Sequence, residues 1–371
     1  MATKKTENSD ADNMRAALAL ARRGLGNAWP NPAVGCVLVR EDLQGMVVGR
    51  GWTRPGGRPH AEAEALRRAG DKARGAAAYV SLEPCDHHGQ TPPCSQALID
   101  AGIVRAVIAI EDPDPRVSGK GIARLRAAGV KVVEGVLEDE ARQANLGFIL
   151  KITKQRPLFA LKLATDGVGR IPAPGDAEKG ITGSLARQRG HLLRACHDGV
   201  LFGVGTVLDD DPEYTCRLPG MSEHSPVRVL LDPQLRLPVN AKLLQTLDKA
   251  PLWVIVGTKP AINRDIYPDS KNLEFIVAGE VDENDRPTPR WVAGELARRG
   301  LTRILIEAGP KVTAAFLRDD LVDRIFWFKT KQPLKDAGVA AFDALTAARQ
   351  FVKTAVHDLG DDILEIYQRT G

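Results

Sequence analysis

Short apolar runs that alternate with helical segments constrain the fold of this chain more than any other feature. Helical segments are expected at 60–70, 95–102 and 122–129, and apolar runs lie between them at 76–83 and 105–112. Apolar runs of this length, bounded by turn residues, predict buried strands. Strands that alternate with helices predict βαβ units, in which helices pack on a sheet. The predicted fold class is therefore α/β.

A second alternating series begins after a long helical stretch at 137–155 and indicates a second α/β domain. Pro157 forces the residue before it out of helical geometry, which places the boundary at Gln155-Arg156-Pro157. The predicted domains are 12–155 and 156–371, and a length of 371 residues suits two domains. The first eleven residues are polar and are expected to be loose. The last apolar run, 362–368, is expected to form an edge strand.

The bulk composition excludes several classes of protein. The formal net charge of +4 is slight for this length and does not favour a nucleic-acid-binding protein, but it suits an enzyme with an anionic small-molecule substrate. Five cysteines, an odd number, argue against a disulfide framework and for a reducing compartment. We find no signal peptide and no apolar stretch long enough to span a membrane. A cytoplasmic protein is expected.

The strongest local signal is His60-Ala61-Glu62, followed by Glu83-Pro84-Cys85 and then Cys94. One imidazole and two thiolates give tetrahedral Zn²⁺ three ligands and leave a fourth position for water. Zinc lowers the pKa of that water towards ~7. Glu62 begins the helix beside the metal, so it can take a proton from water and deliver it to a departing amine. This pattern is typical of zinc-dependent deaminases.

Two other interpretations of these residues stay open. Cys85 and Cys94 could be buried core thiols, with His60 as a helix cap. A purely structural zinc would need a fourth protein ligand, which His87 or His88 could supply.

The residues around this signal resemble the bifunctional deaminase–reductase family of riboflavin biosynthesis. The resemblance is dense over residues 12–150 and rests on five motifs in order: Asn31–Cys36, Pro59–Glu62, Glu83–Gly89, Thr91–Cys94 and Asp112–Pro115. It implies a cytidine-deaminase-like αβα domain that hydrolyses the 2-amino group of 2,5-diamino-6-(5-phosphoribosylamino)pyrimidin-4-one. It also implies that Asn31, His87 and Asp112 bind the substrate. Taken alone, Asn31 could equally belong to a simple Asn-Pro turn, and the residues alone favour an ordinary turn at Asp112.

The second half resembles the reductase domain of the same family, which has a dihydrofolate-reductase-like fold. The matching segments are Leu161–Ala164, Ile181–Gly183, Leu192–Arg194, Gly205–Pro212 and Ile306–Pro310. The resemblance implies that NADPH reduces the ribosyl group to a ribityl chain. It places Arg194, Arg217 and Glu307 on the substrate, and Ala164, Thr206, Asp210, Gly309 and Pro310 on NADPH. From the residues alone, Gly309 and Pro310 lie at a helix N-terminus that suits a phosphate, whereas Arg194 could simply be a solvated side chain.

Several positions depart from the family pattern. Gln90 stands where a basic residue usually follows His-His-Gly, which leaves open how the substrate phosphate is held; Arg116 or Lys120 could compensate. In the second half the departures are the segment after Ala164, Gly180, Pro233 and Lys329–Gln332.

These departures leave alternatives to the bifunctional enzyme. One is a deaminase whose reductase-like domain is degenerate or structural. Another is a polynucleotide-binding deaminase or a zinc-stabilised RNA-binding module, which would need a basic stripe with interleaved aromatic residues. With 5% aromatic residues, mostly inside apolar strands, the chain does not favour it. A homo-oligomer is possible in every case.

Overall fold

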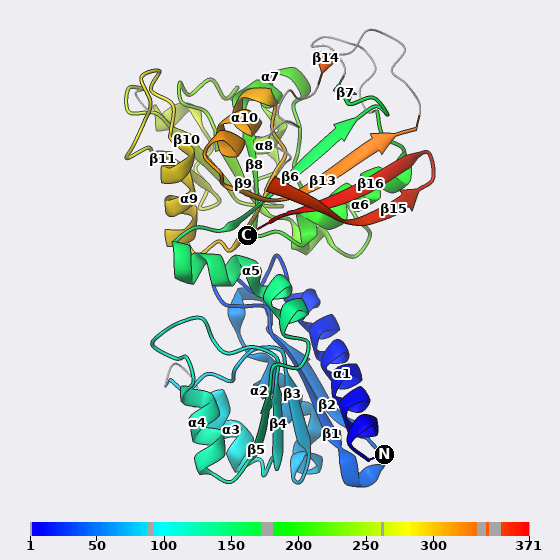
Figure 1. Ribbon diagram of the computed structural model, residues 1–371. Helices are drawn as coiled ribbons and strands as arrows, with labels where there is room; N and C mark the ends of the chain where they lie inside the picture. Colours follow the sequence, from blue (N-terminus) through cyan, green and yellow to red (C-terminus); the bar gives the residue numbers. More distant parts are fainter. Residues whose placement is uncertain are drawn as a thin grey trace. The chain divides into compact units, whose positions relative to one another are not determined.

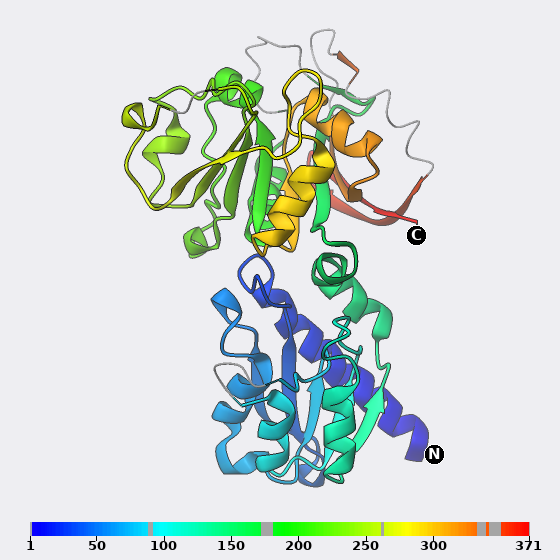
Figure 2. The ribbon, with the colours of Figure 1, turned by 90° about the vertical axis from the view of Figure 1, so that its left-hand side faces the viewer.

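The computed structural model describes residues 2–87, 92–171, 181–260, 263–331, 339–340 and 350–370 (Figures 1 and 2). The chain divides into two compact units, Met1–Arg156 and Pro157–Gly371. Each unit has its own sheet with helices packed on it, which confirms the predicted α/β class for both halves.

The first unit is a five-stranded sheet with strand order β2-β1-β3-β4-β5. β1 pairs antiparallel with β2 and β3, whereas β3, β4 and β5 run parallel. The strands are β1 (Gly35–Arg40), β2 (Met46–Trp52), β3 (Ala77–Val80), β4 (Arg105–Ile108) and β5 (Lys131–Glu134). The helices are α1 (Ala2–Ala21), α2 (Ala61–Ala69), α3 (Cys94–Asp100), α4 (Lys120–Ala127) and α5 (Glu138–Lys154), with 3₁₀ turns η1 (Arg22–Gly24), η2 (Glu41–Leu43), η3 (Pro55–Gly57) and η4 (Gly70–Ala73).

Helix α1 begins at Ala2, so the expectation of a loose N-terminal segment is wrong. The helix is anchored at Asp10, a buried carboxylate whose oxygens accept hydrogen bonds from Arg105 at 2.5 and 2.8 Å and from the Tyr79 hydroxyl at 2.8 Å. Burying a charge is costly unless it is paired. This polar segment therefore makes a specific contact with the sheet, which its composition alone does not reveal.

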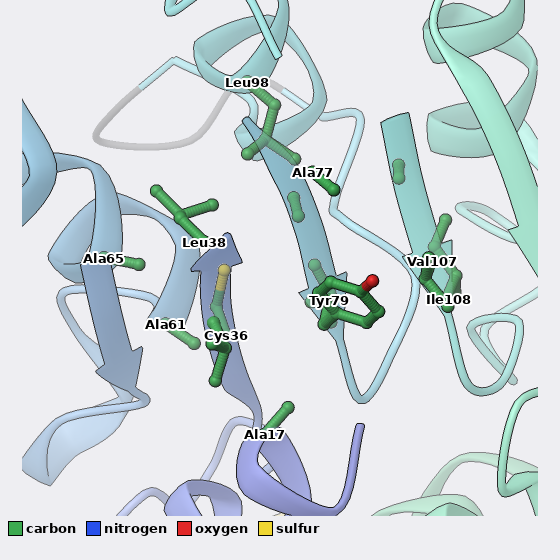
Figure 3. Close-up of a cluster of buried hydrophobic side chains, with 14 of the residues drawn as sticks. Ala17, Cys36, Leu38, Ala61, Ala65, Ala77, Tyr79, Leu98, Val107 and Ile108 are labelled. Atoms are coloured by element: carbon green, nitrogen blue, oxygen red, sulfur yellow. The ribbon is translucent and has the colours of Figure 1, made fainter. Parts of the chain in front are cut away.

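Small residues let two helices approach opposite faces of this sheet closely. A Cβ at Gly35 would lie 1.9 Å from the Ala17 carbonyl oxygen of α1, and one at Gly51 would lie 2.3 Å from the Ala61 carbonyl oxygen of α2. Alanines, Cys36 and Leu38 fill the space between the layers (Figure 3). This tight packing fixes the start of α2, which carries two of the predicted site residues.

The second unit is built on a nine-stranded sheet with strand order β11-β10-β9-β8-β12-β6-β13-β16-β15 (Figure 1). The seven strands from β11 to β13 run parallel, and β16 and β15 are antiparallel additions. The strands are β6 (Leu158–Thr165), β8 (Gly199–Gly203), β9 (Val227–Leu231), β10 (Leu252–Val256), β11 (Leu273–Val277), β12 (Arg303–Ile306), β13 (Val322–Thr330), β15 (Phe351–Leu359) and β16 (Asp362–Arg369), and β7 (Arg170–Ile171) pairs separately with β14 (Val339–Ala340). The helices are α6 (Ser184–Ala195), α7 (Val204–Asp210), α8 (Lys242–Gln245), α9 (Pro289–Arg298) and α10 (Pro310–Arg318), with 3₁₀ turns η5 (Ser222–His224) and η6 (Arg264–Ile266).

The C-terminal strand β16 lies inside the sheet, between β13 and β15, so the prediction of an edge strand at 362–368 is wrong. The edge is β15, in which every fourth residue is half-buried and the three residues between are exposed. Such a pattern lacks the strict alternation by which sequence analysis detects a half-buried strand.

Candidate functional site

Three potential metal ligands meet at the edge of the first sheet where β3 ends. His60 is the residue that immediately precedes α2, Cys85 lies in the loop after β3, and Cys94 is the first residue of α3. Their ligand atoms all lie within 4.8 Å of one another. The structure thus brings together residues that are 25 and 9 positions apart in the sequence.

The spacing of these atoms fits a tetrahedral zinc ion. The His60 Nδ1 atom lies 3.6 Å from the Cys85 sulfur and 3.3 Å from the Cys94 sulfur. Zinc–sulfur bonds of ~2.3 Å and zinc–nitrogen bonds of ~2.1 Å at a tetrahedral angle would place sulfur and nitrogen ~3.6 Å apart. The Cys85 thiolate accepts hydrogen bonds from the Cys94 thiol and from His60, and these lower the pKa of Cys85 to about 4. The donor set therefore suits zinc in both chemistry and size.

The alternative of a structural zinc with a fourth protein ligand gains no support from His87. Among the described residues, this group contains only three members, and His87 is exposed and outside it. His88 lies outside the described residues.

Glu62 lies beside the cluster in the first turn of α2. Its side chain is 3% exposed and is within hydrogen-bonding reach of the Cys94 thiol. Burial raises the pKa of Glu62 to about 7, although the nearby His60 opposes the effect. A carboxyl group that titrates near neutral pH is suited to accept and release a proton in one catalytic cycle.

The buried Glu83 carboxylate organises the backbone around the cluster. It accepts hydrogen bonds from the Asp112 and Gly119 amides at 3.1 and 3.0 Å and from the Ile122 amide at 3.1 Å. Gly121 then packs so closely that a Cβ would lie 2.0 Å from the Pro84 carbonyl oxygen. The loop after β4 and the start of α4 are therefore held directly against Glu83-Pro84-Cys85.

The three residues that the family resemblance assigns to the substrate lie in loops at this same edge. The Asn31 amide donates a hydrogen bond to the Gly57 carbonyl oxygen at 3.0 Å, in the segment that leads to His60. Asp112 is 9% exposed and follows β4; burial raises its pKa to about 6, and the neighbouring Glu83 adds to the effect. His87 is exposed and lies near Asp114. Gln90 lies outside the described residues.

A second group of charged residues lies where β12 and β6 end in the second sheet. The Arg194 guanidinium of α6 donates two hydrogen bonds to the Glu307 carboxylate, at 2.6 and 2.9 Å, and the Lys162 ammonium of β6 lies 3.6 Å from it. Burial would raise the pKa of Glu307, but Arg194 and Lys162 outweigh it and lower the pKa to about 2. Glu307 thus holds two cations in place, and Arg194 is not a merely solvated side chain.

The segment after α7 faces this group. Tyr214 stacks on Phe202 with ring centroids 4.0 Å apart, and its hydroxyl donates to the Glu307 carbonyl oxygen at 2.9 Å. Arg217 is half exposed and pairs with Glu213 at 3.3 Å. Arg194, Glu307 and Arg217 therefore gather around one segment.

The predicted cofactor residues come from three elements of the same sheet edge. Ala164 lies in β6 opposite Phe328, Thr206 and Asp210 lie in α7, and Gly309 is the residue that precedes Pro310 at the start of α10. Gly309 is fully extended, so the first turn of α10 presents its amides at the end of β12. Free amides at a helix N-terminus suit a cofactor phosphate.

In the altered segment after Ala164, polar side chains have hydrogen-bond partners in the structure. Asp166 accepts hydrogen bonds from the Val168 and Arg170 amides at 3.1 and 2.8 Å, and Trp327 donates to the Thr165 hydroxyl at 2.8 Å. Pro233 accepts a hydrogen bond from the Gly257 amide through its carbonyl oxygen at 3.0 Å. Gly180 and Gln332 lie outside the described residues.

Sequence reasoning missed two residues of the second group. Lys162 occurs in a quoted motif but received no role, and His191 received none at all. His191 lies three positions before Arg194, and residues at this spacing share a helix face. That spacing could have identified it.

Comparison with known proteins agrees with this arrangement. Residues 7–110 match the model for the cytidine and deoxycytidylate deaminase zinc-binding region, and residues 166–329 match the model for the RibD C-terminal domain. In the part of the chain that the structure describes, every helix is too short or too polar to cross a lipid bilayer.

Full-length relatives carry both regions. The chain is 37% identical to the riboflavin biosynthesis protein RibD of Aquifex aeolicus (strain VF5), over 97% of this chain and 98% of the relative, and 34% identical to that of Escherichia coli (strain K12), over 94% and 96%. Among solved structures, Acinetobacter baumannii RibD matches with a TM-score of 0.85 and 34% identity over 98% of this chain and all of that one. The Thermotoga maritima diaminohydroxyphosphoribosylaminopyrimidine deaminase/5-amino-6-(5-phosphoribosylamino)uracil reductase matches with a TM-score of 0.85 and 33% identity over the same shares.

The comparisons confirm the predicted family, both fold classes, and zinc and NADPH as cofactors. The chain therefore belongs to the RibD family of riboflavin biosynthesis proteins and joins a zinc-dependent deaminase to an NADPH-dependent reductase in one polypeptide.

Proposed function

We propose that the site around His60, Cys85 and Cys94 deaminates 2,5-diamino-6-(5-phosphoribosylamino)pyrimidin-4-one. The observation that carries this proposal is a three-ligand zinc site with a buried carboxyl group, Glu62, beside it. The name of the Thermotoga maritima relative supports the choice of substrate.

In this proposal His60, Cys85 and Cys94 hold the zinc ion, which supplies the Lewis acidity that makes water a nucleophile at neutral pH. Glu62 accepts a proton as the water oxygen bonds to the ring carbon that bears the amine. The same carboxyl group then delivers the proton to the departing nitrogen, so that the carbon–nitrogen bond breaks and ammonia leaves. The raised pKa of Glu62 suits both transfers.

The pyrimidinone ring would be oriented by Asn31, His87 and Asp112. The hydrogen bond from Asn31 to Gly57 fixes the loop on one side of His60. The hydrogen bond from the Asp112 amide to the Glu83 carboxylate fixes the loop on the other side of the cluster. Both loops are thus rigid where they would contact the ring, which keeps its reacting carbon in place.

In the second unit the deaminated product would be reduced at the ribose C1′ atom to give a ribityl chain. NADPH supplies the reducing equivalents, and Ala164, Thr206, Asp210, Gly309 and Pro310 would hold it. Arg194 and Arg217 would bind the substrate phosphate, and Glu307 would keep the Arg194 guanidinium aligned. The bidentate Arg194–Glu307 contact supports this role because it fixes the plane of the guanidinium.

We further propose that 12–155 and 156–371 are the two functional domains and that the enzyme works in the cytoplasm on a small molecule, without nucleic acid. Five free cysteines support a reducing compartment. A homo-oligomer is compatible with this proposal.

One experiment tests both activities. Purified protein is incubated with the diaminopyrimidinone phosphate, with and without NADPH, and the products are identified by mass. The proposal predicts the deaminated ribosyl product without NADPH and the ribityl product with it. If the ribosyl product persists at millimolar NADPH, and the cofactor shows no saturable binding by fluorescence, the second unit serves only structure.

A further inference from the structure

His191 occupies an unusual position between a hydrogen-bond donor and an acceptor. Its Nδ1 atom lies 3.2 Å from the Thr215 carbonyl oxygen and 3.3 Å from the Arg217 amide nitrogen. A carbonyl oxygen only accepts and an amide N–H only donates. Nδ1 can therefore satisfy one of these two backbone groups at a time, and whether Nδ1 itself carries a proton decides which.

The two choices are not equivalent for the backbone. The Thr215 carbonyl oxygen also lies 3.4 Å from the Arg194 guanidinium, so it keeps a donor without His191. For the Arg217 amide, His191 is the acceptor that the structure provides among the described residues. When Nδ1 carries no proton, both backbone groups are satisfied.

The surrounding charges favour a neutral ring, and the Arg217 amide then favours the tautomer whose Nδ1 carries no proton. Arg194 lies on the same helix, Arg217 lies on the facing segment, and Glu307 lies after β12 with Lys162 beside it. Glu213 pairs with Arg217. Burial, followed by the Arg194 and Arg217 cations, lowers the pKa of His191. The Glu307 carboxylate does not offset the pKa-lowering effect of the two arginine cations. The ring is therefore neutral at physiological pH.

We propose that His191 is a positioning residue of the reductase site: its unprotonated Nδ1 accepts the Arg217 amide hydrogen and so holds Arg217 where it can meet the substrate phosphate. This inference rests on the proposed role of Arg217 in phosphate binding. Protonation of the ring reverses the contact, because Nδ1–H then donates to Thr215 and the Arg217 amide loses its acceptor. Phosphate binding therefore weakens at acidic pH by a route that does not involve the arginines directly.

Two variants separate this role from a merely structural one. In His191→Asn the amide oxygen reaches the place of Nδ1 and accepts the same bond but does not titrate, whereas His191→Leu removes the acceptor. At pH 7.5, His191→Leu should raise the reductase KM for 5-amino-6-(5-phosphoribosylamino)uracil roughly five- to tenfold, with kcat and the KM for NADPH little changed. His191→Asn should remain near wild type. His357→Asn, on the exposed strand β15, is the matched control.

The pH profile supplies the second readout. As the pH falls from about 8 to about 5.5, the wild-type KM should rise more steeply than that of His191→Asn, since both enzymes share the titration of the substrate phosphate near pH ~6 but only one has the histidine. Nitrogen-15 NMR of the wild-type ring at pH 7.5 should show an unprotonated Nδ1. Three results would each overturn the inference. They are parallel pH profiles for wild type and His191→Asn, a protonated Nδ1 at pH 7.5, and a His191→Asn KM as high as that of His191→Leu.

A separate pair of variants shows whether the underlying proposal has failed instead. If Arg194→Met and Arg217→Met leave the substrate KM unchanged, the phosphate does not bind there, and the proposed reductase site is wrong. If both raise the KM but His191→Leu does not, the site stands and the inference about His191 is wrong. The KM for NADPH and thermal denaturation, measured on the same preparations, report whether the second unit of each variant is folded.

Discussion

At the scale of single residues, buried carboxylates hold neighbouring groups in position in both units. Three buried glutamates show this: Glu62 and Glu83 are each 3% exposed, and the side chain of Glu307 is 8% exposed. Each of them has a different environment. Glu62 lies beside thiols, Glu83 is surrounded by backbone amides, and Glu307 lies between two cations. The same functional group therefore serves as a backbone anchor in Glu83 and as a counter-ion in Glu307, and the environment of Glu62 suits its proposed role as a proton carrier.

The first prediction concerns Glu62. In Glu62→Gln the metal ligands are intact, but the side chain can no longer accept a proton, so zinc content should persist while ammonia release falls by about 10²- to 10⁴-fold. The measurement pairs metal analysis with an ammonia assay on the same sample. A variant that deaminates at the full rate would refute the role of Glu62.

The second prediction concerns Glu307. Glu307→Gln leaves the buried Arg194 guanidinium without its partner charge, which should cost about 3–5 kcal/mol in the free energy of unfolding near neutral pH. Because the folded pKa is about 2, against an ordinary value of 4.5, this contribution is complete above 4.5 and is lost as the pH falls toward 2.

Urea denaturation at several pH values measures this difference. The gap between wild type and Glu307→Gln should be constant from pH 8 to about 5 and should narrow below 4.5. A gap that widens on acidification would contradict the assigned charge state of Glu307.

At the scale of helices and strands, close backbone approach determines where the site residues lie. Gly121 allows α4 to contact Pro84, and the Asp86 carboxylate, next to Cys85, accepts from the Ser95 hydroxyl of α3 at 2.6 Å and pairs with Arg124 of α4. The loop that carries Cys85 is thus held by both helices. Zinc affinity should therefore depend on residues that never touch the metal.

A matched pair of glycine variants tests this dependence. Gly121→Ala must move α4 away from Pro84 and should lower both the stability of the first unit and its zinc affinity, the latter by about 10- to 100-fold. Gly294→Ala, in the middle of α9 with open space around the new methyl group, should instead stabilise the protein by roughly 0.5–1 kcal/mol. Thermal denaturation and competition with a chromogenic chelator measure these effects. Equal behaviour of the two variants would show that the approach to Pro84 is not tight.

Much of this arrangement could be predicted from the sequence, because its signals are local. His60, Cys85 and Cys94 were found from motif spacing, and the strands from short apolar runs. The anchoring roles of Glu83 and Asp10 could not be predicted, since their partners lie 29 to 95 residues away. Strand β15 was missed because most of its residues are exposed and they lack the two-residue alternation of a half-buried strand. His191 needed only a helical-face argument, but its two backbone contacts depend on the fold of the segment after α7.

At the scale of the whole molecule, the two active sites draw on separate units. All three proposed zinc ligands lie within Met1–Arg156, whereas Lys162, Arg194 and Glu307 lie within Pro157–Gly371. The two segments that match family models, 7–110 and 166–329, do not overlap. The two activities should therefore be separable.

Removal of the metal tests this separation. A chelator that strips zinc should abolish ammonia release, while NADPH-dependent reduction of the deaminated substrate should persist within about twofold, since the described residues of the second unit contain no group of potential metal ligands. Zinc added back should restore deamination; zinc added to Glu62→Gln is the control. Parallel loss of both activities would mean that the second unit depends on the metal for its folding.

The position of β15 at the edge of the nine-stranded sheet has a consequence for solubility. Its nine residues present an outer row of backbone donors and acceptors, to which another extended chain could add. Lys353, His357 and Asp358 are exposed along this strand, and their charge and hydration oppose such an addition. Apolar substitutions at these three positions would accordingly favour aggregation of concentrated protein, even where neither active site is altered.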